Sequence, residues 1–232
     1  MNEHEDHIPS DDDVISVKRI LNSHLPVEII DDILDLAQYW PHVRERRRME
    51  VKAAADHQAG ETFPKAEWCY IVSPPIPQDA KVHTVKFVIE SRDQGSGGEP
   101  EHQGTYEGSW TWFEAAIIRG EPWWLRKVLT MPVDLYREED GSHVPQDVRS
   151  AARAAEVRSR EEDETRWHEH TIVWPRTDEE IEQHPMRGLI GLSHEFVRLL
   201  EPGDRVALMA RAMFPAWINK VKCASIDVFY TL

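Results

Sequence analysis

The apolar positions near the N-terminus recur at the spacing of a helix. A first stripe follows the capping-box-like pair Ser10 and Asp13 and consists of Val14, Val17 and Leu21. Pro26 interrupts this stripe, since proline is tolerated in the first turn of a helix but not inside one. A second stripe consists of Ile29, Ile30, Ile33, Leu34 and Ala37 and ends before Pro41. The pattern predicts a helical hairpin over residues 10–41.

Two segments beside this hairpin have no apolar pattern. Residues 1–9 are acidic, and we expect them to form a disordered tail. Residues 42–65 are first highly charged and then small and polar, without an apolar stripe wide enough to require burial. We expect this second segment to be a charged linker.

From residue 66 onward the pattern changes to that of strands. Runs rich in β-branched and aromatic residues are separated by clusters of Pro or Gly, and Val85, Phe87 and Ile89 alternate with their neighbours at a period of two. No suitable helix separates the first runs, which favours antiparallel pairing. The spacing predicts an antiparallel β-sandwich or jelly roll over residues 66–232. Residues 145–166 are the exception, because they contain good helix formers and predict a helical or partly ordered insertion.

Charge and composition limit the partners. The 232 residues contain 27 Lys and Arg against 42 Asp and Glu, a net charge of −15. Such a surface repels a phosphate backbone unless its basic residues are segregated, so we expect no nucleic-acid partner. Neither a signal peptide nor an apolar run of about 20 residues is present, so we expect no membrane partner and an intracellular location, cytoplasmic or nuclear. The distant Cys69 and Cys223 are expected to be reduced and buried.

Catalytic signatures are missing from the sequence. It contains no GxSxG, HExxH or Cys-His pattern, and Ser193, His194 and Glu195 are contiguous, whereas catalytic triads assemble from separated positions. The GSGG loop lacks the strand and helix of a nucleotide-binding motif, so it is read as a turn. We therefore expect no catalytic residue and no cofactor, and a protein that is not an enzyme.

His168 and His170 form the one close histidine pair at strand spacing, which directs both rings to the same face. Two histidines and a carboxylate can hold a metal ion, with Glu195 or His194 as candidate third ligands. Isolated His-x-His pairs are mostly surface residues. His168 and His170 are therefore metal candidates, but we expect both to be ordinary strand residues.

The nine tryptophans suggest two roles. Trp110 and Trp112 share one face of a strand, and we expect them to fill the sandwich core. Trp123 and Trp124 follow a turn, where exposed aromatic residues on a rigid sheet commonly serve in recognition. We expect these two to be exposed and to bind a protein or a glycan.

Several polar residues are expected to gather with these loop tryptophans near one end of the sandwich. The predicted ligand site consists of Arg92, Asp93, Arg119, Trp123, Trp124, Arg211 and Trp217. Arginines can bind an acidic group through bidentate hydrogen bonds, so a peptide or a glycan is the expected ligand.

The N-terminal segment LPVEIIDDILDLAQYW resembles the opening of an F-box, a Leu-Pro helix that packs against the adaptor of a cullin ubiquitin ligase. The matching residues are Leu25, Pro26, Glu28, Ile29, Ile33 and Leu34. The later F-box helix is replaced here by the charged ERRRMEVK. The whole chain resembles fungal proteins that join such a helix to a Trp-rich β domain. This resemblance implies a protein partner bound through Leu25, Pro26, Ile29, Ile33 and Leu34.

The sequence allows two interpretations of the hairpin. It docks onto a partner, or it packs on the sheet and buries Ile30, Ile33 and Leu34 within the chain. The first gives a non-enzymatic recognition or adaptor protein, such as a substrate-recognition subunit of a cullin ligase. The alternatives are a small-ligand- or glycan-binding jelly roll, including a metal-dependent enzyme, and a structural homo-oligomer.

Overall fold

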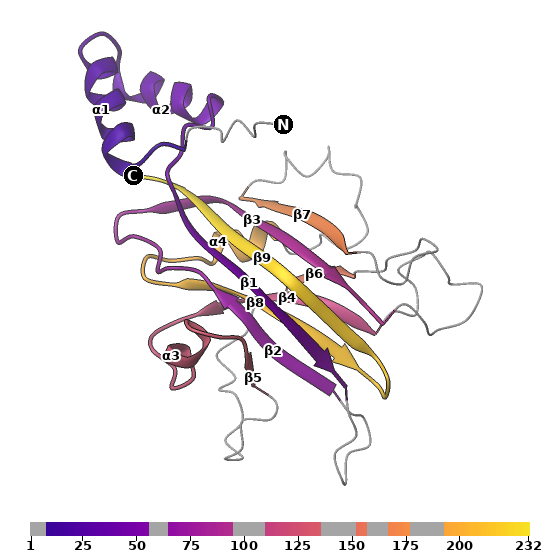
Figure 1. Cartoon of the computed structure of the whole chain (residues 1–232). Coiled ribbons are helices and arrows are strands. Elements are labelled where there is room, and N and C mark those ends of the chain that lie inside the picture. The colour runs from indigo at the N-terminus through magenta and orange to yellow at the C-terminus, as the bar shows by residue number, and fades with distance from the viewer. Residues whose placement is uncertain (1–7, 56–64, 95–109, 136–151, 157–166, 177–192) are drawn as a thin grey trace.

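The computed structural model describes residues 8–55, 65–94, 110–135, 152–156, 167–176 and 193–232. Two antiparallel sheets pack face to face, and two short N-terminal helices lie at one end of them (Figure 1). The predicted β-sandwich with an N-terminal helical hairpin is confirmed.

The elements have the following bounds. The helices are α1 (Asp11–Asn22), α2 (Val27–Leu36), α3 (Leu125–Val128) and α4 (Ser193–Arg198). The strands are β1 (His42–Ala54), β2 (Lys65–Val72), β3 (Lys81–Arg92), β4 (Thr111–Ile118), β5 (Val133–Asp134), β6 (Ala152–Glu156), β7 (His168–Pro175), β8 (Arg205–Met213) and β9 (Ile218–Thr231). No described helix is long and apolar enough to cross a membrane.

The strand order is that of a jelly roll. One sheet has the order β1-β9-β3-β7, and the other has the order β5-β2-β8-β4-β6. Strand β1 pairs with β9, β2 with β8, β3 with β7 and β4 with β6, all antiparallel. The chain thus folds back on itself as a long two-stranded ribbon that is rolled into two sheets. The short β5 is an addition at the edge beside β2.

The main core lies between the sheets. The inner faces contribute side chains that alternate with outward-facing neighbours, as the period of two requires. Its largest fully buried members include Tyr70, Phe87, Phe113, Leu208 and Ile226. Helix α4 adds Phe196, whose ring packs edge-on against Trp174 at 5.1 Å between centroids.

The linker predicted for residues 42–65 is wrong over residues 42–54, which form the edge strand β1. The reason is that Arg47 turns inward, where its Nη1 donates to the Tyr70 carbonyl at 2.6 Å. The Tyr70 hydroxyl in turn donates to the Met49 carbonyl at 2.8 Å. Val51 and Ala53 then continue the buried face. The inward-facing residues of β1 therefore follow a period of two, but one of these inner positions holds an arginine instead of an apolar residue. Residues 56–64 lie outside the described residues.

The insertion predicted as helical is a strand where it is described. Residues 152–156 form β6, which pairs antiparallel with β4. Alanine favours a helix in isolation, and pairing with β4 overrides that preference. The rest of residues 145–166, the acidic residues 1–7 and the GSGG loop lie outside the described residues.

The two cysteines are free, as predicted. Cys69 is fully buried, and burial raises the pKa of its thiol to about 12. Cys223 is only partly buried, on the outer face of the other sheet, where its thiol donates to Glu90 Oε2 at 3.3 Å.

Candidate functional site: the helical hairpin and its junction

The hairpin is built by local signals. Ser10 caps α1 through a capping box, in which its Oγ accepts from the Asp13 amide and its own amide donates to Asp13 Oδ2. Helix α2 begins directly after Pro26, in agreement with the break expected there. Three buried residues, Val14, Ile30 and Leu34, form the small core between the two helices. Val17, Leu21, Leu25 and Tyr39 pack around that core while remaining partly exposed.

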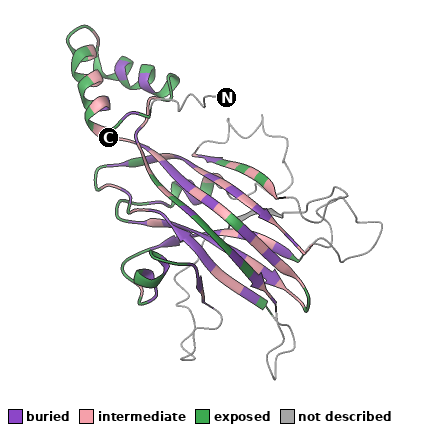
Figure 2. Ribbon diagram, viewed as in Figure 1, coloured by how far each residue is buried: buried purple, intermediate pink, exposed green. Residues whose placement is uncertain are grey.

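Helix α2 also carries a second apolar row that the hairpin does not cover. The row consists of Ile29, Ile33 and Leu36, at positions i, i+4 and i+7, and we call it the apolar stripe. Its members are 46%, 39% and 87% exposed. They lie in the largely exposed hairpin that projects from the end of the sandwich (Figure 2). Helix α2 is therefore apolar on two sides, and one of them faces solvent.

An acidic row runs beside the apolar stripe. Glu28, Asp32 and Asp35 repeat the spacing of the stripe one position earlier in each case, and we call them the acidic flank. Residues 11–36 hold seven acidic residues and two basic ones. The exposed side of the hairpin thus combines apolar anchors with negative charge.

Some of the predicted partner-binding residues are exposed in the structure, and others are buried in the hairpin. Ile29 and Ile33 are exposed and available to a partner, and Pro26 is the exposed N-cap of α2. Leu34 is buried in the hairpin core and Leu25 packs against that core. The prediction that Leu34 contacts a partner is therefore wrong. The alternative interpretation is correct for Ile30 and Leu34 and wrong for Ile33. Sequence alone does not separate the two sides of α2, because both are apolar.

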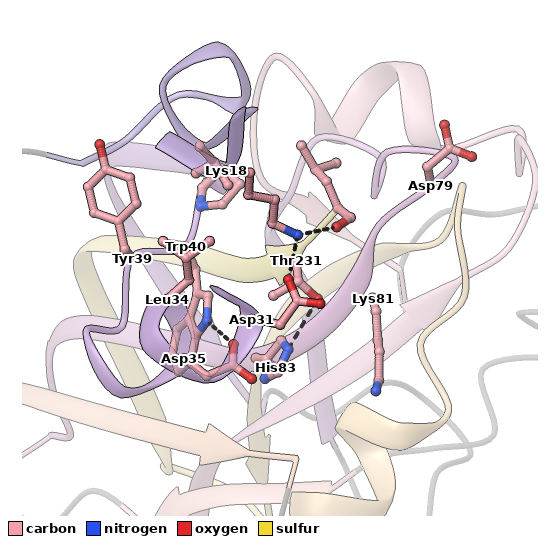
Figure 3. Close-up of a pocket in the computed structure, with 13 residues that line it drawn as sticks. Lys18, Asp31, Leu34, Asp35, Tyr39, Trp40, Asp79, Lys81, His83 and Thr231 are labelled. Atoms are coloured by element: carbon pink, nitrogen blue, oxygen red, sulfur yellow. Dashed lines mark hydrogen bonds and ion pairs between the residues drawn. The ribbon is translucent and has the colours of Figure 1, made fainter. Parts of the chain in front are cut away.

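A few specific contacts hold the hairpin against the sandwich (Figure 3). Trp40 stacks on His83 of β3 with 4.9 Å between ring centroids and an interplanar angle of 16°. The indole nitrogen of Trp40 donates to Asp35 Oδ1 at 2.9 Å. On the other helix, the Tyr230 hydroxyl donates to Asp11 Oδ1 at 2.9 Å. Both helices are therefore tied to strands of the same sheet.

Two cavities lie at this junction. One has a volume of about 350 Å³ and includes Lys18, Asp31 and Lys81 among its lining residues. The other has a volume of about 500 Å³ and includes Asp32 and Arg176. Asp35, Trp40 and His83 line both cavities. The junction offers both charge signs and an aromatic wall, groups that could contact a small polar molecule.

The junction should weaken at low pH. Burial lowers the pKa of His83 below its ordinary value of 6.5, Lys81 and Arg176 lower it further, and Asp35 opposes them. The unfolded chain then binds the proton more readily than the folded one, so the free energy of unfolding should fall as the pH drops below 6.5.

Denaturation of the wild type and of His83→Gln, above and below that pH, checks this expectation. The variant should lose less stability on acidification. It should not lose all the dependence, because burial also lowers the pKa of His42 and of His170. Equal losses in the two proteins would contradict the role assigned to His83.

The predicted ligand site at one end of the sandwich is wrong, because its members lie at both ends. Strand β4 runs antiparallel to β8, so Arg119, which follows β4, lies beside Arg205 at the start of β8. Trp123 and Trp124 follow Arg119 in the chain. Arg92, Asp93, Arg211 and Trp217 lie near the opposite end, where β8 turns into β9. Sequence order does not show which loops share an end until the strand directions are known.

The arginines of that predicted site make contacts within the protein. Arg119 Nε lies 3.3 Å from Asp204 Oδ1, and its Nη2 donates to the Leu199 carbonyl at 3.0 Å. Arg211 lies between Glu67 and Glu114, 2.9 Å from the latter. Arg92 stacks its guanidinium over Trp167 at 4.9 Å. Asp93 is buried, and Trp217 packs against the main core. These contacts stabilise the fold and do not converge on one pocket.

The two loop tryptophans have opposite environments. Trp123 is 58% exposed, as predicted, whereas Trp124 is 3% exposed, which contradicts the prediction. The cause is that the turn leads directly into α3, where successive side chains point about 100° apart. Trp124 therefore faces a second apolar cluster with Leu125 and Val128, on the outer face of the sheet that contains β2 and β8.

The tryptophans assigned to the core lie outside it. Phe113 fills the inner face of β4, so Trp112 and Trp110 face outward by the period of two. The indole nitrogen of Trp112 donates to Glu114 Oε1 at 2.7 Å. Trp110 is 42% exposed and packs edge-on against Phe214. The shared face was predicted correctly and its direction was not.

His168 and His170 lie on the same face of β7, with ring centroids 6.5 Å apart. In the described part of the chain, no group of three or more His, Cys, Asp or Glu residues could hold a metal ion. Neither Glu195 nor His194 therefore completes such a group within those residues. We assign no function to this histidine pair.

Three residues of the hairpin site were not expected from the sequence. Leu36 follows the spacing of Ile29 and Ile33 and could have been found as the next member of that row. Trp40 and His83 gave no signal, because their contact joins segments far apart in the chain. No family model matches this chain, and no curated protein or solved structure matches it either.

Proposed function

We propose that this protein is a non-enzymatic interaction protein that docks onto a partner through the apolar stripe of α2. The exposure of Ile29, Ile33 and Leu36 is the observation that supports this proposal. Fully burying a wholly exposed side chain of this kind is worth about 1.5–3 kcal/mol, so a partner gains most from Leu36 and less than half of that value from each of Ile29 and Ile33. Anchors at i, i+4 and i+7 are the pattern of a helix that binds in a groove.

The acidic flank specifies the chemistry of the partner surface. An apolar groove with basic residues along one rim would cover the stripe and face Glu28 and Asp32. Charge pairs at the rim of an interface raise the association rate and exclude like-charged surfaces more than they add affinity. We infer a partner with a basic rim.

The jelly roll serves as the scaffold in this proposal. The Trp40–His83 stack and the Tyr230–Asp11 hydrogen bond fix the hairpin at one end of the sandwich. An anchored helix pair loses less conformational entropy on binding than a free segment does. The protein would therefore act as an adaptor that presents one preformed docking element.

The F-box resemblance makes the helical adaptor of a cullin ubiquitin ligase the partner to test first. In this chain β1 begins at His42, directly after Pro41, so the match is confined to two helices. The proposed role is a substrate-recognition subunit that contacts the adaptor with those two helices. A small-ligand-binding function is the second candidate, and the two junction cavities favour it.

The pair of substitutions Ile29→Asp and Ile33→Asp tests the docking proposal. Co-purification with the cullin adaptor should be lost, because charges would enter the apolar interface. The thermal transition should stay in place, because both side chains are exposed in the free protein. Leu129→Asp with Met131→Asp is the matched control, since both residues are similarly exposed near α3. Adaptor binding that survives the first pair, or that is lost with the control pair, would contradict the proposal.

A further inference from the structure

The outer face of β1 carries a row of arginines. Arg44, Arg46 and Arg48 alternate along the strand and are exposed, whereas Arg47 between them is buried. In Figure 2 the exposed residues of β1 follow the edge of the sandwich. One arginine of β1 is therefore part of the core, and the other three face solvent. The sequence shows this group only as a charged run.

Neighbouring strands extend the basic character of this face. Lys220 and Lys222 of β9 and Arg92 of β3 lie beside the end of the row. Three carboxylates offset part of this charge: Asp227 pairs with Arg44, Glu90 pairs with Lys222, and the exposed Glu169 of β7 lies across from Glu90. Basic residues therefore outnumber carboxylates on this face, although the net charge of the chain is −15.

A row of small side chains lies next to the arginines. Arg46 is in register with Ser225 of β9, Ser225 with Val88 of β3, and Val88 with Thr171 of β7. All four residues are at least partly exposed. Arg48 is in register with Cys223, so the β9 residues directly beside Arg46 and Arg48 are both small. A peptide lying parallel to β1 would pass over Ser225 and Cys223.

The spacing of the row fits an extended peptide. Alternate residues of a strand are about 6.4–6.8 Å apart, both along β1 and along any extended peptide that lies parallel to it. Carboxylates at alternate positions of such a peptide would meet successive arginines, each able to form two parallel hydrogen bonds.

As a ligand of this face, a nucleic acid is less favoured than a short acidic peptide. The net charge of −15 repels a long polyanion, whereas a short peptide interacts mainly with charges within a Debye length of about 8 Å. We propose that the outer face of the β1-β9-β3-β7 sheet binds an extended acidic peptide segment, with Arg46 and Arg48 pairing with its alternate carboxylates. This surface lies on the sandwich, so the proposal does not depend on docking by the hairpin.

Binding of a synthetic peptide in which Glu and Thr alternate tests this inference, measured by fluorescence anisotropy on the full chain at about 0.15 M salt. Arg46→Ala with Arg48→Ala should weaken binding roughly tenfold, the loss of two exposed charge pairs. Arg126→Ala with Lys127→Ala removes the same charge from exposed positions on α3 and should leave the affinity unchanged. Ile29→Asp with Ile33→Asp should also leave it unchanged.

Three outcomes would overturn the inference. The first is equal weakening by the two charge-removing pairs, which would reduce the effect to net charge. The second is equal binding of a peptide of the same composition whose Glu residues are grouped in one block, which would exclude the extended register. The third is tighter binding of a single-stranded oligonucleotide than of the alternating peptide, which would assign the face to nucleic acid. Melting temperatures of all variants confirm that they are folded.

Discussion

Replacing Trp124 by alanine is expected to lower the free energy of unfolding by about 3–5 kcal/mol. The Trp124 side chain is almost fully buried and packs with Leu125 and Val128 against the outer face of the sheet that contains β2 and β8. The substitution removes a large apolar volume from a site that cannot collapse without moving α3. Urea denaturation of wild type and variant measures the difference.

The neighbouring tryptophan is the matched control. Trp123→Ala should change the free energy of unfolding by no more than about 0.5 kcal/mol, because that side chain lies mostly in solvent. The same residue type is thus removed from adjacent positions with opposite consequences. A large loss in Trp123→Ala together with a small one in Trp124→Ala would show that the environments of the two side chains are assigned the wrong way round.

Replacing Arg47 by alanine is expected to cost about 2–4 kcal/mol of stability, a large effect for an arginine. The guanidinium donates to the Tyr70 carbonyl from inside the sandwich, so its removal leaves a buried acceptor unsatisfied and a space unfilled. Arg47→Met should cost less, because it restores part of the volume. Thermal and chemical denaturation of both variants give the comparison.

Arg46→Ala is the control for this prediction, since Arg46 is exposed one position away. Its effect should stay within about 0.5 kcal/mol. If Arg47→Ala were as stable as Arg46→Ala, the burial and the carbonyl contact assigned to Arg47 would be wrong.

The sequence was sufficient for the elements whose periodicity is carried by apolar residues. The hairpin helices and the alternating run of Val85, Phe87 and Ile89 follow directly from spacing. Strand β1 did not, because one of its inner positions holds Arg47, whose long side chain buries its stem and finds a carbonyl partner. A charged residue at an inner position interrupts the alternation of apolar and polar residues from which a strand is predicted.

The candidate site was predictable only in part, for a related reason. Ile29 and Ile33 were identified, but the distinction between the buried and exposed sides of α2 depends on where α1 packs. The inward or outward direction of Trp112 and Trp124 likewise depends on neighbouring elements, and local spacing gives only the shared face or the turn. The grouping of loops at one end required the strand directions, which sequence spacing does not contain.

Position-specific crosslinking tests the docking claim most directly. A photoreactive amino acid is placed at Leu36, the most exposed member of the apolar stripe, and in a second protein at Leu129, an exposed leucine next to α3. Each protein is irradiated in extract of the native cell, and the adducts are identified by mass spectrometry. Docking by the hairpin predicts an adduct between position 36 and the helical adaptor of a cullin ligase, absent from position 129. An adduct of position 36 with only a second copy of this chain, or the same adducts from both positions, would contradict it.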